Sequence, residues 1–138
     1  MHTDRQTELR NIIIFYLRYR FLITRQIAYQ NQTGKHEPII ANKLYPPIPY
    51  YTANVIMLKI NAIIAMYDYE TQNIINMRFA QNKTLDALSG LLDMSRSRCY
   101  EKLQYIIDDI LLKILMSSSD ARDILLSQNI YDYQIHEI

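Results

Sequence analysis

The sequence predicts an all-α protein, and three observations support this fold class. Glycine and proline are scarce, with two and four residues in a chain of 138. Apolar residues recur at three- and four-residue steps, which is the helical spacing, while strand-like alternation is nearly absent. Hydrophobic residues make up 49% of the chain and charged residues 21%, a composition that excludes disorder and supplies a core.

The predicted architecture is a long N-terminal helix, a middle helix and a C-terminal tri-helical helix-turn-helix with an extended final helix. This plan divides the chain into an N-terminal helix with a proline-containing linker, residues 1–50, and a helical domain with an acidic tail, residues 51–138. The length fits one domain, or one small domain with an extra helical layer.

The first predicted helix covers residues 4–30. Its apolar residues share one face and three arginines lie roughly opposite, so the first interpretation is a core helix with a solvated basic face. A helix that binds phosphate or forms an oligomer is the second interpretation. The apolar face consists of Leu9, Ile12, Tyr16, Tyr19, Ile23 and Ile27, and the arginines are Arg10, Arg18 and Arg25.

Residues 31–50 interrupt the helical pattern. Asn31, Thr33 and Gly34 predict the end of the first helix, and the three prolines in residues 45–49 restrain their predecessors to extended backbone. We expect an extended connection or a mobile loop here. A proline-rich ligand for a partner is the alternative, and a rigid linker is the more common use of such a segment.

Helical spacing resumes over residues 51–67, with a bend expected at Asp68 or Tyr69. A further helix over residues 70–80 directs Ile74, Ile75 and Phe79 inward, and residues 81–83 form a polar turn. Residues 84–103 follow these two helices and are the most informative segment for predicting function.

Residues 84–103 predict two short amphipathic helices joined by a tight turn, which is a helix-turn-helix. Thr84 and Ser95 each precede a helix and can cap it by accepting a backbone N–H. Asp93 lies in the turn, where a left-handed conformation tolerates Asp, and Ser89 supplies the small side chain that a close crossing needs. The apolar residues expected between the helices are Leu85, Leu88, Leu92, Met94, Cys99 and Leu103.

The helix that starts at Ser95 is predicted to extend to about Met116, with a buried stripe at 99, 103, 106 or 107, 110 and 114. Three serines at 117–119 end it, and Asp120 can cap a short terminal helix that contains Ile124 and Leu125. The last ten residues have three open interpretations: they pack back on the fold, pair with another subunit or stay loose.

The second helix of this motif begins with a capping serine and two arginines, as a DNA-reading helix usually does, because its first residues reach base edges and phosphates. The outward positions are Arg96, Ser97, Tyr100, Glu101 and Gln104, with Arg98 and Lys102 beside them.

The net charge of +1 conceals an uneven distribution. Residues 1–35 carry six Lys or Arg against two acids, and residues 76–105 carry five against three. Residues 106–138 carry two against six. A basic front and an acidic tail are compatible with a nucleic-acid contact on one side.

Other classes of function find little support. Cys99 is the only cysteine, which excludes an internal disulfide and a cysteine-based zinc site and fits a reducing cytoplasm. The N-terminus is polar and no apolar run approaches the roughly 20 residues of a membrane span, so we expect a soluble protein without a signal peptide. The histidines are scattered, and Asp108 and Asp109 are adjacent on a helix and point apart. We therefore predict no enzymatic activity, no metal and no cofactor.

The helix-turn-helix resembles the fourth conserved region of bacterial sigma factors. The pattern includes Arg78-Phe79, Thr84-Leu85 and Leu92 to Arg98, matches without a gap, and covers residues 70–112. Ser89, Asp93 and Cys99 stand where that family has alanine, glycine and valine, and Asp93 is the departure that weakens the match. The whole-chain plan is similar to ArpU/RinA-type phage late-gene transcription regulators.

This resemblance implies that the helix from Ser95 enters the major groove of double-stranded DNA. Arg96 or Arg98 would pair with guanine while the other contacts phosphate. Ser97, Tyr100, Glu101 and Gln104 would contact bases or backbone, and Lys83, Thr84 and Lys102 would contact phosphate. One helix-turn-helix seldom binds DNA tightly alone, so we expect a homodimer or a complex with RNA polymerase. The resemblance also implies the cytoplasm of a bacterium or of a phage-infected host cell.

Two alternatives stay open. One is a helical adaptor that binds RNA polymerase or another protein without reading DNA, and the other is a small DNA-packaging recognition subunit. A complete sigma factor is disfavoured because residues 1–69 leave no room for a separate promoter-melting module.

Overall fold

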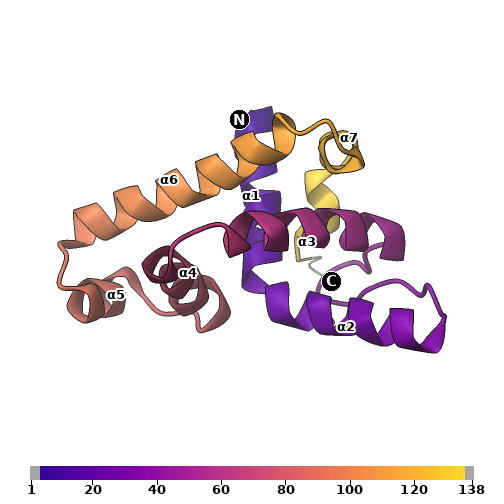
Figure 1. Cartoon of the computed structure of the whole chain (residues 1–138), viewed down its shortest axis with the longest axis horizontal. Helices are drawn as coiled ribbons and strands as arrows, with labels where there is room; N and C mark the ends of the chain where they lie inside the picture. The colour runs from indigo at the N-terminus through magenta and orange to yellow at the C-terminus, as the bar shows by residue number, and fades with distance from the viewer. Residues whose placement is uncertain (1–3, 136–138) are drawn as a thin grey trace.

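The computed structural model describes residues 4–135, and within them the fold is all-α as the sequence predicts. Seven α-helices, one π-helical turn and one 3₁₀ turn follow each other along these residues, and an isolated antiparallel bridge between Ile39 and Ile48 is the extended pairing that accompanies them (Figure 1). None of the helices in this part of the chain is long and apolar enough to cross a membrane.

The predicted N-terminal helix over 4–30 is wrong in one respect, because it is two helices. α1 spans Arg5–Arg18 and α2 spans Arg20–Thr33, and Tyr19 between them leaves helical geometry with φ −102° and ψ 17°. The two helices run in clearly different directions (Figure 1). Apolar spacing continues through the break, because α1 buries its stripe against α6 and α2 buries its stripe against α3.

Contacts of the residues at the break explain why the chain turns there. The Tyr19 ring packs on Phe15 and Tyr45 at centroid distances of 5.0 and 5.6 Å. The Arg20 side chain donates to Asn61 Oδ1 at 2.7 Å and to Asn76 Oδ1 at 3.2 Å. Tyr45, Asn61 and Asn76 lie far along the chain from the break, so tertiary contacts fix the turn, which carries no local signal such as proline or glycine.

The linker is an extended connection, which is one of the two forms predicted for it. α2 ends at Gly34, whose φ of +70° is the left-handed conformation that glycine adopts without strain. The backbone of Ile39 and Ile48 then pairs in both directions, at 2.7 and 2.8 Å, and both side chains are buried. This pairing returns the chain to the core before α3 (Tyr50–Ala65) begins.

The C-terminal segment packs back on the fold as far as Tyr133, which is buried. α7 (Asp120–Leu126) lies against α3, and η2 (Ile130–Tyr133) lies against α1. The expected cap of α7 is wrong, because Ser119 occupies the cap position without a side-chain hydrogen bond and Asp120 is the first helical residue. Residues 136–138 lie outside the described part of the chain, so the prediction for the last three residues stays open.

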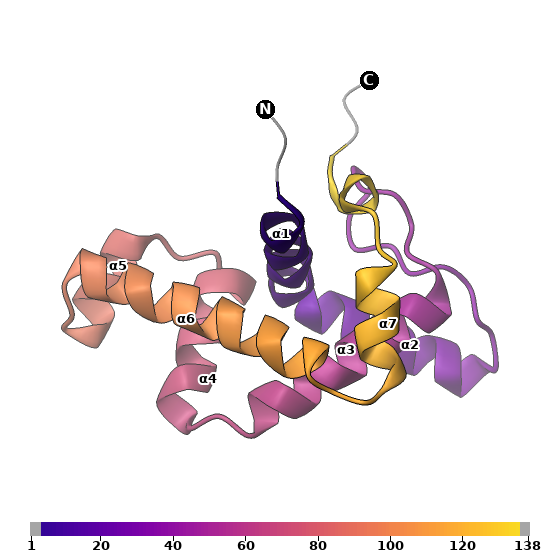
Figure 2. The ribbon, with the colours of Figure 1, turned by 90° about the horizontal axis from the view of Figure 1, so that it is seen from above.

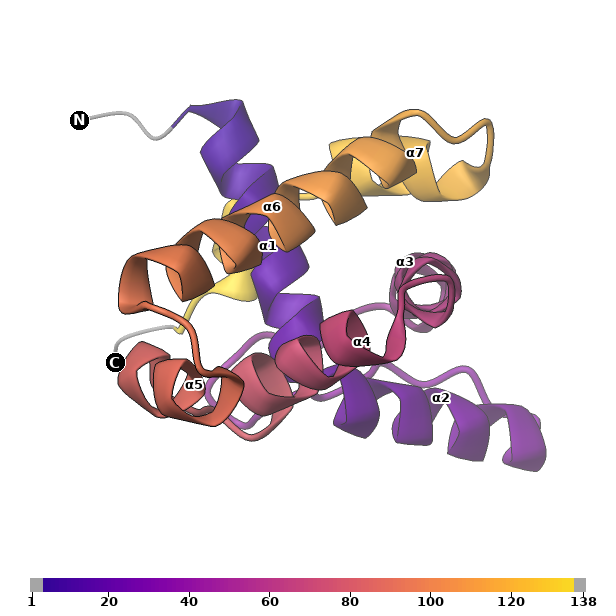
Figure 3. The same ribbon diagram turned by 60° about the vertical axis from the view of Figure 1, so that its left-hand side comes forward.

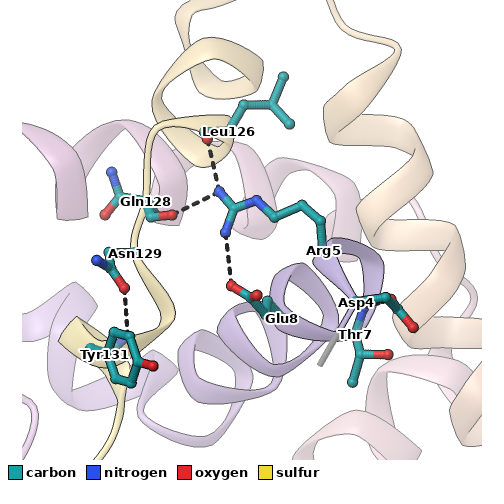
Figure 4. A network of polar contacts seen from close by, with 8 residues as sticks. All are labelled: Asp4, Arg5, Thr7, Glu8, Leu126, Gln128, Asn129 and Tyr131. Atoms are coloured by element: carbon teal, nitrogen blue, oxygen red, sulfur yellow. Dashed lines mark hydrogen bonds and ion pairs between the residues drawn. The ribbon is translucent and has the colours of Figure 1, made fainter. Parts of the chain in front are cut away.

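Arg5 ties the start of α1 to this returning segment (Figure 4). Its guanidinium donates to the backbone oxygen of Leu126 at 2.8 Å and of Gln128 at 2.7 Å, and it pairs with Glu8 at 3.3 Å. Deeper in the fold, the hydroxyls of Tyr16 and Tyr133 bond to each other at 2.8 Å. The two ends of the described chain are therefore joined by both polar and aromatic contacts.

A single core joins residues from both predicted units, 1–50 and 51–138. α1 crosses the middle of α6 (Arg96–Leu115), and the two helices are the centre of the fold (Figure 3). This crossing holds the C-terminal half of α6 in the core and leaves its N-terminal half toward one end of the molecule.

Candidate nucleic-acid interface

The predicted tri-helical unit is built from α4 (Tyr69–Ile75) with its continuation η1 (Asn76–Ala80), α5 (Leu85–Leu92) and α6. α5 packs on α6 and on η1, and this end of the molecule lies at one extreme of its longest axis, far from α2 and α7 (Figures 1 and 2). The last five residues of the predicted 70–80 helix form a π-helical turn, which periodicity did not predict.

The caps of α5 and α6 and the left-handed turn between these helices form as the sequence predicts. Thr84 Oγ1 accepts from the Ala87 N–H at 3.1 Å, and Ser95 Oγ accepts from the Arg98 N–H at 3.2 Å. Asp93 adopts the left-handed conformation, with φ 52° and ψ 46°. The Ser89 hydroxyl donates to the Met94 backbone oxygen at 2.5 Å and closes the turn.

Apolar residues support the start of α6 from behind. Leu88, Cys99 and Leu103 are buried, with at most 4% of each exposed, and Leu85, Leu92 and Met94 are half-buried against them. The predicted stripe on α6 is fully buried, and it includes both Ile106 and Ile107. These isoleucines pack in the core of the chain, and Leu112 is the large apolar residue of the segment Ile106–Ile114 that is exposed.

Seven of the ten predicted contact residues are exposed. They are Thr84, Ser95, Arg96, Ser97, Arg98, Tyr100 and Glu101. Lys83, Lys102 and Gln104 are half-buried. The Lys102 ammonium pairs with Glu70 at 3.4 Å, and the Gln104 side-chain oxygen accepts from the Arg10 guanidinium. Lys83 is engaged through its backbone oxygen, which accepts from Arg78 at 2.7 Å.

The first turn of α6 therefore presents two arginines to solvent. Arg96 lies 3.7 Å from Asp86, but the two side chains are 67% and 78% exposed. An ion pair in that setting contributes little, because water screens it and both side chains lose freedom. The arginine can leave Asp86 for a phosphate or a guanine at small cost.

Arg10 is the contact that sequence reasoning missed. Its spacing predicts a solvated face, yet Arg10 is half-buried, donates to the Gln104 side-chain oxygen and pairs with Asp108 at 2.9 Å. Arg10 thus links α1 directly to the helix that carries the candidate interface. The only sequence signal was its position on the same helix as Arg18, and that spacing does not reveal which element lies opposite.

The carboxylate of Asp109 on α6 has structural partners. Asp109 accepts from Tyr67 at 2.5 Å and pairs with Lys113 at 2.8 Å, so it points away from the Arg10 partner Asp108. Burial raises the pKa of Tyr67, and the bond to Asp109 adds to that shift. Within residues 4–135, no three or more His, Cys, Asp and Glu residues form a group that could hold a metal ion. His2 and His136 lie outside the described residues.

Comparison with known proteins adds no relative. No known protein family, curated protein or solved structure matches the chain.

Proposed function

We propose that the protein is a sequence-specific DNA-binding transcriptional regulator that reads the major groove with the start of α6. Within this class, the plan of the chain favours an activator of phage late genes. The observation that carries the proposal is the exposed first turn of α6, with Arg96 and Arg98 beside a capping serine and a buried support behind them. That combination is how helix-turn-helix proteins present a reading helix.

The residue chemistry assigns roles to this surface. One arginine would pair with the O6 and N7 atoms of a guanine, and the other would contact phosphate. Ser97 and Tyr100 can donate to bases or backbone, and Glu101 can accept from the amino group of cytosine. A double-stranded operator is therefore the proposed ligand, bound by two copies or together with RNA polymerase.

A salt titration of DNA binding tests the proposal. Duplexes selected in vitro from a random library are compared with a random duplex, using the wild type and Arg96→Ala/Arg98→Ala. We expect steep salt dependence for the wild type and loss of discrimination between duplexes in the double variant. Arg25→Ala/Arg122→Ala removes the same charge from exposed positions on α2 and α7 and should keep the discrimination.

Three results would contradict the proposal. Absence of salt-dependent binding together with retention of purified RNA polymerase would favour the adaptor. Large rings in light scattering would favour the packaging subunit. An equal loss of discrimination between duplexes in both double variants would mean that general charge, and not the α6 surface, drives binding.

A further inference from the structure

A cleft of about 220 Å³ lies beside the exposed start of α6, among α1, η1, α5 and α6. Its apolar lining belongs largely to the core. Its polar lining consists of Arg18 from α1, Arg78 from η1, and Tyr100 and Gln104 from α6. The cleft thus connects the N-terminal helix to the surface that we propose reads DNA.

Each of these polar groups can donate a hydrogen bond into the cleft. Arg18 is exposed, and Arg78 uses one guanidinium nitrogen on the Lys83 backbone oxygen and keeps its other donors. A guanidinium only donates, so the bond from Arg10 requires the Gln104 oxygen to face Arg10 and leaves the amide NH₂ for other partners.

This cleft differs from another cavity with basic residues in the charge of its lining. The cavity of about 440 Å³ between α4 and α6 has Lys102 and Lys113 in its lining. Glu70 pairs with Lys102 at 3.4 Å and Asp109 with Lys113 at 2.8 Å, so carboxylates balance both lysines. The Arg18 cleft has two arginines and no carboxylate in its lining. The charge of this lining favours an anion over a cation.

The position along α6 indicates which anion. Tyr100 and Gln104 follow Arg96 by four and eight residues, which is roughly 6 and 12 Å along a helix axis. The major groove is about 12 Å wide. If the first turn of α6 contacts base edges in the major groove, the cleft therefore lies beside the sugar-phosphate backbone that borders the groove.

We propose that this cleft binds one backbone phosphodiester of the DNA duplex, with Arg18 as its direct ion-pair partner. Arg78 and the Gln104 amide donate to the same phosphate, and α1 thereby sets how far α6 enters the groove. The inference rests on the proposed function, because it needs α6 in the major groove. It adds a contact from outside the helix-turn-helix.

Arg18→Ala tests the inference in the full chain, with Arg25→Ala on α2 as the matched loss of one exposed charge. Binding to a selected and to a random 30-bp duplex (roughly three helical turns) is measured across salt. Removal of one phosphate contact should lower the slope of log K against log salt by about 1, equally for both duplexes. Arg25→Ala should keep the wild-type slope, and Arg18→Lys should recover it in part.

Two results would overturn the inference. One is an Arg18→Ala slope equal to that of Arg25→Ala, while Arg96→Ala/Arg98→Ala still loses discrimination, which would leave the proposed function intact. The other is Arg18-dependent binding of inorganic phosphate or a mononucleotide as tight as that of the duplex, which would make the cleft a small-anion site. Failure of the wild type to bind any duplex would instead refute the proposed function. Thermal melts of each variant check that folding is retained.

Discussion

Replacement of Asp93 tests the turn on which the candidate interface depends. At φ 52° and ψ 46° a side chain with a Cβ is strained, by about 1–2 kcal/mol for an ordinary L residue and by less for Asp, which can bond locally. Asp93→Ala should therefore destabilise the fold by about 1 kcal/mol, and β-branched Asp93→Val by more. Asp93→Gly removes the strain, and a gain in unfolded-chain entropy of about 0.4–1 kcal/mol offsets that relief. We expect its stability within about 0.5 kcal/mol of the wild type.

Urea denaturation followed by circular dichroism measures these differences. Asp86→Gly is the control, because Asp86 lies in the first turn of α5. Glycine there loses helix propensity and a favourable charge at the helix start, so it should cost about 0.5–1 kcal/mol. The reasoning is refuted if Asp93→Ala is as stable as the wild type, or if Asp93→Gly loses as much as Asp86→Gly.

Three further predictions concern the capping, the pH dependence and the closure of the fold. Ser95→Ala removes the cap of α6 and should cost about 1 kcal/mol, whereas Ser95→Gly should cost a few tenths, as measured by urea midpoints; equal costs would contradict the cap. Burial raises the pKa of Tyr16 and Tyr133 above the usual value of about 10. The unfolded chain ionises first, so stability should hold below pH 10 and fall as pH rises beyond it. Tyr16→Phe/Tyr133→Phe should make that alkaline fall in stability shallower. An unchanged profile would exclude these two hydroxyls as its cause. Arg5→Ala frees two backbone oxygens and should speed hydrogen exchange over residues 124–133; unchanged exchange there would mean that aromatic packing alone holds the segment.

The parts of the fold that are fixed by local chemistry were predictable from sequence. The caps at Thr84 and Ser95 and the left-handed turn at Asp93 each depend on one side chain and its own backbone, so residue type and spacing suffice. The buried stripe of α6 was predictable for the same reason, because helical periodicity directs it to one side.

The parts fixed by distant partners were not predictable. The break at Tyr19 depends on Tyr45, Asn61 and Asn76, and apolar spacing runs through it without interruption. Arg10 is half-buried because α6 crosses α1, and the amphipathic patterns of the two helices do not predict that crossing. The cleft lined by Arg18 and Tyr100 also depends on how α1 crosses α6, so the spacing of residues in the motif could not predict it.

The site of DNA contact can be measured directly by ¹H–¹⁵N NMR during titration with a selected duplex. The account predicts that the largest amide shift changes fall on residues 95–101 at the start of α6, with a second group around Arg18 and Arg78. Changes confined to α2 and α7, toward the opposite end of the long axis, would contradict it (Figure 1).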